Sequence, residues 1–464
     1  MLSCESKNGG NDELCRFTYD RLSNCKITST LSFFHRPMDI EKKILSDPLN
    51  KWVFDNSGRG TFLVGGYLRD LLLGIQKQQL GYKAKDRDFA VKSSFKAKNI
   101  AIRTAKKFNG TFIILKPGQT YRVVLKNKVG TTRFREILDF SPFNTSINND
   151  LMRRDFTINA MAWSPETGIV DTFKGRKDLA NSTLKAVRMK NLTQDPLRII
   201  RAYRIAAELG FKIEKLTRKN LKKNSGKFAG VAPERITDEF FKFLCTDNAI
   251  EYLNECSKDS VLRKILSSNK RIRKIDTLSK RINILNKFDS FLKIQLKKIE
   301  RTNEGKQISA FLKQEVSQGL NRIGLIRLAL LTTDIPIYDS ILRFSGDIHK
   351  SVRDIHSGYR AALQKIPYTE LYKIFNASGN RCFEIAILLS FIKRKNIKKI
   401  FRRANEYLKI KNKILLSGND VQDILQIKPG EEIGRVLSGL KDMQYMKLVK
   451  TRAQARKWLQ CNFT

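Results

Sequence analysis

The chain has 464 residues, of which 89 are lysine or arginine and 45 are aspartate or glutamate, so its formal net charge is +44. Hydrophobic residues make up 41% of the sequence, which is enough for packed cores and excludes a disordered basic tail. The apolar runs, such as the one between Glu384 and Lys393, are much shorter than the ~20 residues of a membrane-spanning helix. The charge points to an acidic partner, with nucleic acid ahead of an anionic membrane surface, unless a lysine-rich proteome bias explains it.

The first 37 residues contain four acidic residues and no long apolar stretch, which argues against a secretory signal or a transit peptide. We expect this extension to be disordered, and Met38, at the start of an amphipathic helix, is a candidate translation start. Seven cysteines without Cys-x-x-Cys spacing, and only three histidines, give little support to a zinc cluster or a disulfide framework. Reduced thiols in the cytoplasm fit best.

Short β-rich runs alternate with turns between about residues 50 and 165. Strands are predicted at 61–64, 88–91, 111–115, 121–125 and 136–140, with a helix over 93–108. This pattern indicates a small α/β or α+β sheet domain.

From about residue 195 onward, apolar residues recur every three or four positions, which predicts an almost entirely helical half. Basic runs lie in this half, at 270–274, 280–281, 393–395, 398–399 and 402–403. They predict cationic helix faces that follow a phosphate backbone or, alternatively, ordinary solvated faces. Residues from about 416 to 458 form a small, separate helical cap in this interpretation.

The first predicted strand ends at Gly65 and Gly66, and a helix follows from Tyr67. Glycines let backbone N–H groups approach an anion at a helix N-terminus, and Arg69 is placed to add a charged contact. A glycine turn of this kind is more often only structural.

Asp86 and Asp88 are two residues apart in a predicted strand, so their side chains project from the same face. Two such carboxylates repel each other unless a divalent cation lies between them, and their oxygens suit Mg²⁺ that also binds substrate phosphates. Two ions there would activate an attacking hydroxyl and stabilise a leaving pyrophosphate. Asp139 is a candidate third carboxylate from an adjacent strand. Surface acids at strand ends are the alternative.

The segment from Arg153 to Ala162 is dense in polar residues. If it is helical, Asp155 and Asn159 are i,i+4 neighbours on one face. Together with Arg153 and Arg154 they form a candidate site for a triphosphate and a ribose hydroxyl.

A further helix is predicted around Pro196, which suits its first turn. Asp195, Arg198, Arg201 and Arg204 recur every three residues and form a slanted stripe of neighbouring side chains. An aspartate and an arginine one turn apart can hydrogen-bond the Watson–Crick edge of a base, while further arginines reach phosphates. The alternative is an intrahelical salt bridge on a solvated face.

Together, these segments resemble the class II tRNA nucleotidyltransferase and bacterial poly(A) polymerase family. Five family motifs occur in order: the Gly-Gly turn with Arg69, Asp70 and Asp-x-Asp, the Arg-Arg-Asp element at 153–160, a hinge-like element at 171–179, the element with Asp195 and Arg198, and a last element at 234–239. The cap around residues 430–434 also resembles the family.

The resemblance implies an α+β protein, with a polymerase-β-like nucleotidyltransferase sheet domain followed by an all-helical neck, body and tail. We therefore expect an N-terminal extension at 1–37, a head at 38–170, a neck for base reading and RNA binding at 171–245, a body at 246–410 and a C-terminal cap at 411–464.

The resemblance also implies an enzyme that adds CCA, or only C or A, to the 3′ end of tRNA from CTP and ATP with release of pyrophosphate. Asp86 and Asp88 would be the catalytic residues and the ligands of two Mg²⁺ ions. The expected nucleotide-binding residues are Gly65, Gly66, Arg69, Arg154, Asp155, Asn159, Asp195, Arg198, Arg201 and Arg204.

Two departures from the family pattern affect the expected chemistry. Gln194 stands where the family has glutamate, which would loosen the hydrogen bonds around Arg198 and blur the choice between C and A. The helix 326–335 resembles a remnant of a His-Asp phosphohydrolase domain, with Thr333 in place of the histidine before Asp334. A working metal site there is not expected.

Two other functions remain open. A poly(A) polymerase would tail RNA with ATP, but the segment 113–124 lacks the Gly-Arg-Arg-Phe element expected of that branch. A catalytically inactive RNA-binding relative would have no need for the repulsive pair of Asp86 and Asp88. We expect no membrane association.

Overall fold

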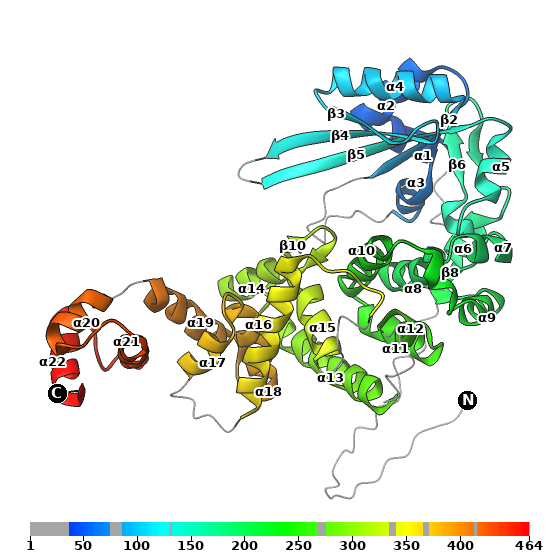
Figure 1. Ribbon diagram of the computed structural model, residues 1–464. Helices are drawn as coiled ribbons and strands as arrows, with labels where there is room; N and C mark the ends of the chain where they lie inside the picture. Colours follow the sequence, from blue (N-terminus) through cyan, green and yellow to red (C-terminus); the bar gives the residue numbers. More distant parts are fainter. Residues whose placement is uncertain are drawn as a thin grey trace, which may run out of the picture.

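The computed structural model describes residues 37–74, 86–129, 132–266, 275–333, 340–364, 371–412 and 415–463. The predicted N-terminal extension, up to residue 36, and the basic run at 270–274 lie outside the described residues. Within them, none of the helices combines the length and the apolarity that crossing a membrane requires. Figure 1 shows a sheet with its own helices above a set of helices that continues to the C-terminal cap.

A seven-stranded mixed sheet forms the head, with the order β3-β4-β5-β2-β1-β6-β7. Within this sheet only β2 and β5 run parallel. The strands are β1 Thr61–Val64, β2 Arg87–Lys92, β3 Thr111–Lys116, β4 Thr120–Val129, β5 Thr132–Phe143, β6 Ala162–Ser164 and β7 Gly168–Val170. All five strands predicted from the sequence are confirmed.

The helices of the head are α1 Pro37–Leu45, α2 Pro48–Ser57, α3 Gly65–Leu72, α4 Ser94–Lys107, α5 Ile147–Met152 and the 3-10 turn η3 Thr157–Asn159. Helices α2 and α4 lie above the long strands in Figure 1, and α3 is joined to α2 by a hydrogen bond from Asn50 Nδ2 to the Tyr67 hydroxyl at 3.3 Å. Phe89 of β2 stacks on Phe140 of β5 with ring centroids 5.2 Å apart, and Phe54 of α2 packs on Phe89. Because side chains alternate along a strand, Asp86 and Asp88 project from the opposite face to Phe89.

The segment Arg153–Ala162, for which a helix was considered as one possibility, does not form a helix. Helix α5 ends at Met152, and η3 is a single turn before β6. The backbone bonds elsewhere instead: Thr157 N–H donates to the Lys185 carbonyl at 2.9 Å, and Val187 N–H donates to the Asp155 carbonyl at 3.1 Å. These contacts with a neighbouring segment replace the i→i−4 bonds that a helix needs.

The neck is helical as expected, apart from one short strand pair. Its elements are α6 Gly175–Ala180, β8 Thr183–Leu184, α7 Met189–Gln194, α8 Leu197–Leu209, β9 Lys212–Ile213, α9 Lys215–Lys223, the 3-10 helix η4 Lys227–Gly230 and α10 Pro233–Leu244. Helix α8 buries a stripe that includes Ile200 and Tyr203, and it ends at Gly210, whose φ of +70° is left-handed. Helices α8 and α10 pack side by side, which brings two of the sequence motifs together.

Among the described residues that follow α10, the regular elements are helices, except for β10 Glu315–Ser317 and β11 Leu320–Asn321. The body contains α11 Ala249–Lys258, α12 Val261–Leu266, α13 Ile275–Ile299, α14 Asn303–Lys313, α15 Arg322–Thr332, α16 Gly346–Leu363, α17 Leu371–Ala377, α18 Cys382–Ile392 and α19 Ile397–Asn412. The cap contains α20 Gly418–Leu425, α21 Glu431–Tyr445 and α22 Arg452–Phe463, which share an apolar cluster around Val421 and Leu440.

Candidate functional site

The carboxylates predicted to bind metal lie at one end of the strand pair β2–β5. Asp88 and Asp139 are partners in its parallel register, and the exposed Asp86 directly precedes β2. Burial raises the pKa of Asp88 to about 6; nearby Asp139 and Asp86 act in the same direction, against Arg154 and Arg201. Burial is thus the main cause of the raised pKa, and the neighbouring carboxylates add to it.

The Gly65 turn lies directly against Asp88. Gly65 has a φ of +78°, and a Cβ atom placed on it would lie 2.7 Å from Asp88 Oδ2 and 3.5 Å from Arg154 Nη1. Only glycine combines that backbone conformation with so close an approach. The turn, the carboxylate and the guanidinium therefore converge on one place.

The carboxylates fit a hard divalent cation. Asp139 accepts two hydrogen bonds from Arg122, at 2.8 and 2.7 Å, and is thereby largely neutralised. Asp86 and Asp88 bring further carboxylate oxygens to the same end of β2. In the part of the chain that the structure describes, no group of three or more His, Cys, Asp or Glu side chains is arranged to hold a metal ion. Two carboxylates suit a cation such as Mg²⁺, which takes its other ligands from water and phosphate.

Several residues predicted to bind nucleotide form a buried polar chain in the head. Arg69 binds Asp70 through Nε and Nη2 and donates from Nη1 to Asn159 Oδ1 at 2.9 Å. Asn159 in turn donates to Asp155 Oδ1 at 3.2 Å, the i,i+4 contact that the sequence suggested, although the segment is not helical. Their nucleotide contacts stay a prediction; the structure places them beneath the Gly65 turn as a framework.

The chain of contacts continues into the neck through Asp155. Arg201 donates to Asp155 Oδ2 from Nε at 3.1 Å and from Nη2 at 3.0 Å, and to Glu239 Oε1 from Nη1 at 3.1 Å. Arg204 donates to Glu239 Oε2 at 2.6 Å and to Glu208 at 2.9 Å. Head, α8 and α10 are thus joined by one ion-pair network.

The lowered pKa values of its two carboxylates, Asp155 and Glu239, agree with this network. Burial alone would raise the pKa of Asp155, but Arg201 and the hydrogen bonds from Asn159 and the Phe156 amide outweigh it and lower that pKa to about 2. Burial opposes the charged form of Glu239 as well, yet Arg204 and Arg201 lower its pKa. Both carboxylates are therefore ionised and paired at neutral pH.

The predicted base-reading pair is held more loosely. Asp195 and Arg198 are 32% and 21% exposed, and Arg198 Nε lies 3.8 Å from Asp195 Oδ2. Arg235 of α10 reaches the same oxygen, with Nη2 at 3.6 Å. Neither distance is that of a hydrogen bond. Burial lowers the pKa of Arg198, which stays charged.

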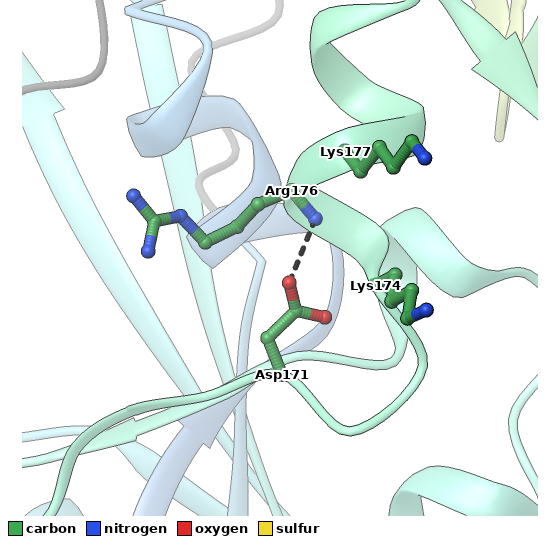
Figure 2. A pocket seen from close by; sticks show the side chains of 4 residues that line it. All are labelled: Asp171, Lys174, Arg176 and Lys177. Atoms are coloured by element: carbon green, nitrogen blue, oxygen red, sulfur yellow. Dashed lines mark hydrogen bonds between the residues drawn. The ribbon is translucent and has the colours of Figure 1, made fainter.

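An open pocket of about 290 Å³ lies at the hinge-like element, lined by Asp171, Lys174, Arg176 and Lys177. Asp171 accepts hydrogen bonds from the amides of Gly175 at 2.6 Å and Arg176 at 3.0 Å, so it caps α6. Figure 2 shows the dashed bond to Arg176, with that guanidinium and the two lysine ammonium groups pointing to different sides of α6. The sequence identified this element but named no site residue in it.

Sequence reasoning missed Glu239, Glu208 and Arg235. A signal was available for two of them, because Arg235 and Glu239 are four residues apart and share one face of a predicted helix. Their partners on α8 are distant in sequence, and no spacing rule identifies such contacts.

The phosphohydrolase-like segment shows no metal-binding arrangement among the described residues. Thr333 donates to the Ala329 carbonyl at 2.9 Å, and His356 Nε2 lies 2.9 Å from the same carbonyl oxygen. Burial lowers the pKa of His356. Asp334 lies outside the described residues.

Two family models match the chain: the poly(A) polymerase head domain over residues 61–185, and the probable RNA- and SrmB-binding site of polymerase A over residues 210–270. A CC-adding tRNA nucleotidyltransferase of Synechocystis is 30% identical, over 81% of this chain and 87% of its own. That of Geobacter sulfurreducens is 26% identical, over 87% and 92%. A CCA-adding enzyme of Leuconostoc citreum is 27% identical, over 86% and 91%.

Among solved structures, the fold is similar to that of the Thermotoga maritima CCA-adding enzyme complexed with tRNA. The TM-score is 0.62 at 18% sequence identity, and the match covers 92% of this chain and 98% of the other. The similarity extends over head, neck, body and cap, and agrees with the α+β architecture expected from the sequence.

Proposed function

Because the chain belongs to the class II CCA-adding tRNA nucleotidyltransferase family, we propose that it extends the 3′ end of tRNA with nucleotides taken from CTP and ATP. The observation that carries the proposal is the convergence of the Gly65 turn, Asp88 and Arg154 at one end of β2. Relatives that add CC and relatives that add CCA both align over most of the chain, so either product is compatible with the alignments.

In this proposal Asp86 and Asp88 hold divalent cations. Polymerase-β-like nucleotidyltransferases generally use such metals, and the oxygen donors favour Mg²⁺, in a two-ion arrangement. The metal would supply charge neutralisation at the triphosphate and acidify the attacking hydroxyl. Arg154, beside Asp88, binds phosphate oxygens, and the backbone of Gly65 and Gly66 approaches them closely. The 3′ hydroxyl oxygen forms a bond to the α-phosphorus as the bond to pyrophosphate breaks.

Asp195 and Arg198 select the base. Asp195 accepts from the amino group that cytosine and adenine share, and Arg198 donates to the neighbouring ring nitrogen. The ion-pair network holds the neck against the head and thereby positions these groups. Its members are Arg69, Asp155, Asn159, Arg201 and Arg204. This division of roles refines the broader set of contacts expected from the sequence.

The neck and body would bind the tRNA. Helix α9 exposes four lysines on its surface: Lys215, Lys219, Lys222 and Lys223. The basic run on α19 is partly neutralised, because Arg402 donates to Glu304 at 2.8 Å and Lys398 lies 3.5 Å from it. We therefore place the stronger RNA contact on α9. Among the described residues the cysteines are free thiols, which supports a cytoplasmic location.

In the test, the purified protein is incubated with tRNA transcripts that end at the discriminator base, at C or at CC, and with an unstructured RNA. Each RNA is supplied with one NTP at a time. We expect CTP to be added to the first two transcripts, and no extension of the unstructured RNA. Asp88→Asn serves as the matched inactive control. Robust tailing of the unstructured RNA with ATP alone would contradict the proposal and favour a poly(A) polymerase.

A further inference from the structure

A buried arginine, Arg87, lies in the sequence between the two carboxylates proposed to bind metal. Because side chains alternate along a strand, Arg87 projects from the face of the sheet opposite to Asp86 and Asp88. Its side chain is only 1% exposed, and it donates from Nη2 to Asp47 Oδ2 at 2.7 Å and from Nη1 to Glu136 Oε2 at 2.8 Å. The strand that carries the carboxylates is therefore held on its other face by two ion pairs.

Two partners of Arg87 belong to elements that build the site. Glu136 lies on β5, three residues before Asp139, in the strand that runs parallel to β2. The Arg87 Cζ atom lies 5.1 Å from the centre of the Tyr67 ring, and Tyr67 directly follows the Gly65–Gly66 turn in α3. One guanidinium thus contacts both β5 and α3, and both elements pack against β2.

The remaining partner, Asp47, is itself held in place. Its Oδ1 atom accepts hydrogen bonds from the amides of Leu49 and Asn50, both at 3.1 Å, so it caps the N-terminus of α2. Asn50 in turn donates from Nδ2 to the Tyr67 hydroxyl at 3.3 Å. Two of the groups around the guanidinium are therefore linked to each other through α2, which restricts the movement of Arg87 between them.

The carboxylates lie where the backbone ladder of β2 ends. Among the described residues, the pairing of β2 with β5 begins at Arg87, and its pairing with β1 extends only to Asp88, so Asp86 lies beyond both ladders. Strand ends open more readily than strand centres, because fewer backbone hydrogen bonds hold them. The side-chain bonds of Arg87 hold the chain at this point, between the two residues whose oxygens must keep fixed positions around a metal ion.

We propose that Arg87 is a positioning residue that holds the start of β2, and with it the carboxylates of Asp86 and Asp88, in the arrangement that binds divalent cations. Arg87 touches neither metal nor nucleotide, because its guanidinium lies on the other face of the sheet. The inference rests on the proposed function and deepens it, since the middle position of the Asp-x-Asp element had no expected role.

The first measurement is the binding of Mn²⁺, a paramagnetic substitute for Mg²⁺, to the full-length protein without nucleotide or tRNA, followed by the loss of the free-ion EPR signal. We expect Arg87→Met to raise the Kd of Mn²⁺ about tenfold, as is typical when a group that orients metal ligands is lost. Arg87→Lys keeps the charge but not the fork of donors, so its Kd should fall between the two. Asp88→Asn gives the signal that remains when the site itself is damaged.

Arg327→Met is the matched control, because Arg327 is another buried arginine in an ion pair. It lies on α15 in the body, is 5% exposed, and donates to Asp289 Oδ1 at 2.6 Å and to the Leu244 and Thr246 carbonyls at 2.8 Å. This variant should lose thermal stability but keep the wild-type Kd of Mn²⁺.

The second measurement is the Mg²⁺ concentration that gives half-maximal addition of C to a tRNA transcript, at a temperature at which all variants are folded. Arg87→Met should raise this concentration and lower kcat, with the KM for tRNA unchanged, because the RNA-binding helices are not altered. Arg327→Met should change neither the Mg²⁺ requirement nor kcat.

Equal Kd values for Mn²⁺ in wild type and the Arg87 variants would overturn the inference, and if Arg87→Met does not fold, Arg87→Lys decides by the same criterion. An equal loss of Mn²⁺ affinity in Arg327→Met would also overturn it, because lost stability alone would then explain the effect. So would wild-type protein that binds no more Mn²⁺ than Asp88→Asn. Failure of the proposed function is distinguishable, because wild-type protein would then bind Mn²⁺ and leave every tRNA transcript unextended.

Discussion

Replacing Arg201 with methionine tests whether the ion-pair network holds head and neck together. Arg201 is the one residue that contacts both the Asp155 carboxylate of the head and the Glu239 carboxylate of α10 in this network. Methionine keeps much of the aliphatic length but removes the charge and all the donors. Asp155 then retains only Asn159 and the Phe156 amide, and Glu239 retains only Arg204.

The magnitude follows from the titration of Asp155. Its pKa lies at about 2, against an ordinary value of 3.8. A difference of that size corresponds to about 2–3 kcal/mol of stability at neutral pH. The loss of the Arg201 hydrogen bond from Glu239 adds to this cost, since removing one partner of a buried ion pair typically costs about 3–5 kcal/mol. For a cooperative unit of about 200 residues, the melting temperature should fall by about 5–15 °C.

The pH dependence gives a second readout with a definite sign. Because the pKa of Asp155 is lowered in the folded state, its contribution is present above the unfolded pKa of about 3.8 and is lost as the pH falls through the folded value of about 2. The difference in melting temperature between wild type and Arg201→Met should therefore be largest near pH 7 and should shrink as the pH is lowered toward 3.

Thermal melts of both proteins across this pH range check the prediction. Lys51→Met is the control, because Lys51 and Asp55 form an exposed i,i+4 pair at 2.9 Å, whose loss should change stability by no more than about 0.5 kcal/mol. If Arg201→Met melts at the wild-type temperature at pH 7, or if its deficit does not depend on pH, the network does not stabilise the contact between head and neck.

Three further predictions concern chemistry and binding. Asp88→Asn should abolish nucleotide addition in the tRNA extension assay and leave tRNA affinity in a filter-binding assay near wild type. It should also raise the melting temperature in EDTA, because it relieves repulsion with Asp86 and Asp139. Wild-type turnover of this variant would refute the metal assignment. Arg198→Ala should alter the ratio of kcat/KM for CTP and ATP more than tRNA affinity, and an unaltered ratio would count against its base-reading role. The affinity for tRNA should fall steeply with salt, with a slope of about −0.7 to −0.9 per neutralised phosphate, and Lys219→Ala should reduce that slope; a flat response would assign the net charge of +44 to composition alone.

The sheet of the head was predictable from the sequence because its signals are local. Runs such as 61–64 and 88–91 are short and rich in β-forming apolar residues, and period-two alternation places Asp86 and Asp88 on one face without knowledge of the neighbouring strands. The helical half follows equally from the three-to-four-residue spacing of apolar residues.

The partners of the polar residues were not predictable in this way. The arginine spacing of α8 shows that Arg198, Arg201 and Arg204 lie on one stripe. It does not show that two of them, Arg201 and Arg204, form ion pairs with Glu239 of α10. The same limit explains why the sequence could not decide whether Arg153–Ala162 is helical, since its backbone bonds are made to residues 185–187, about thirty positions along the chain. A sequence pattern identifies which side chains share a face of one element, and packing between elements decides which are left for a ligand.

That packing divides the polar residues of the site into two sets with different consequences. Asp155, Arg201 and Glu239 are joined in a continuous network, so under the proposed function we expect a change in any of them to affect CTP and ATP alike. Arg198 and Arg235 approach Asp195 without hydrogen-bonding it, so they lie outside this network. Because Glu239 and Arg235 are one turn apart on α10, the helix that is bound to α8 through Glu239 also brings a guanidinium close to Asp195. Under the proposed function, the network that joins the first set holds α8, and with it Asp195 and Arg198, in the position that discrimination between two bases requires.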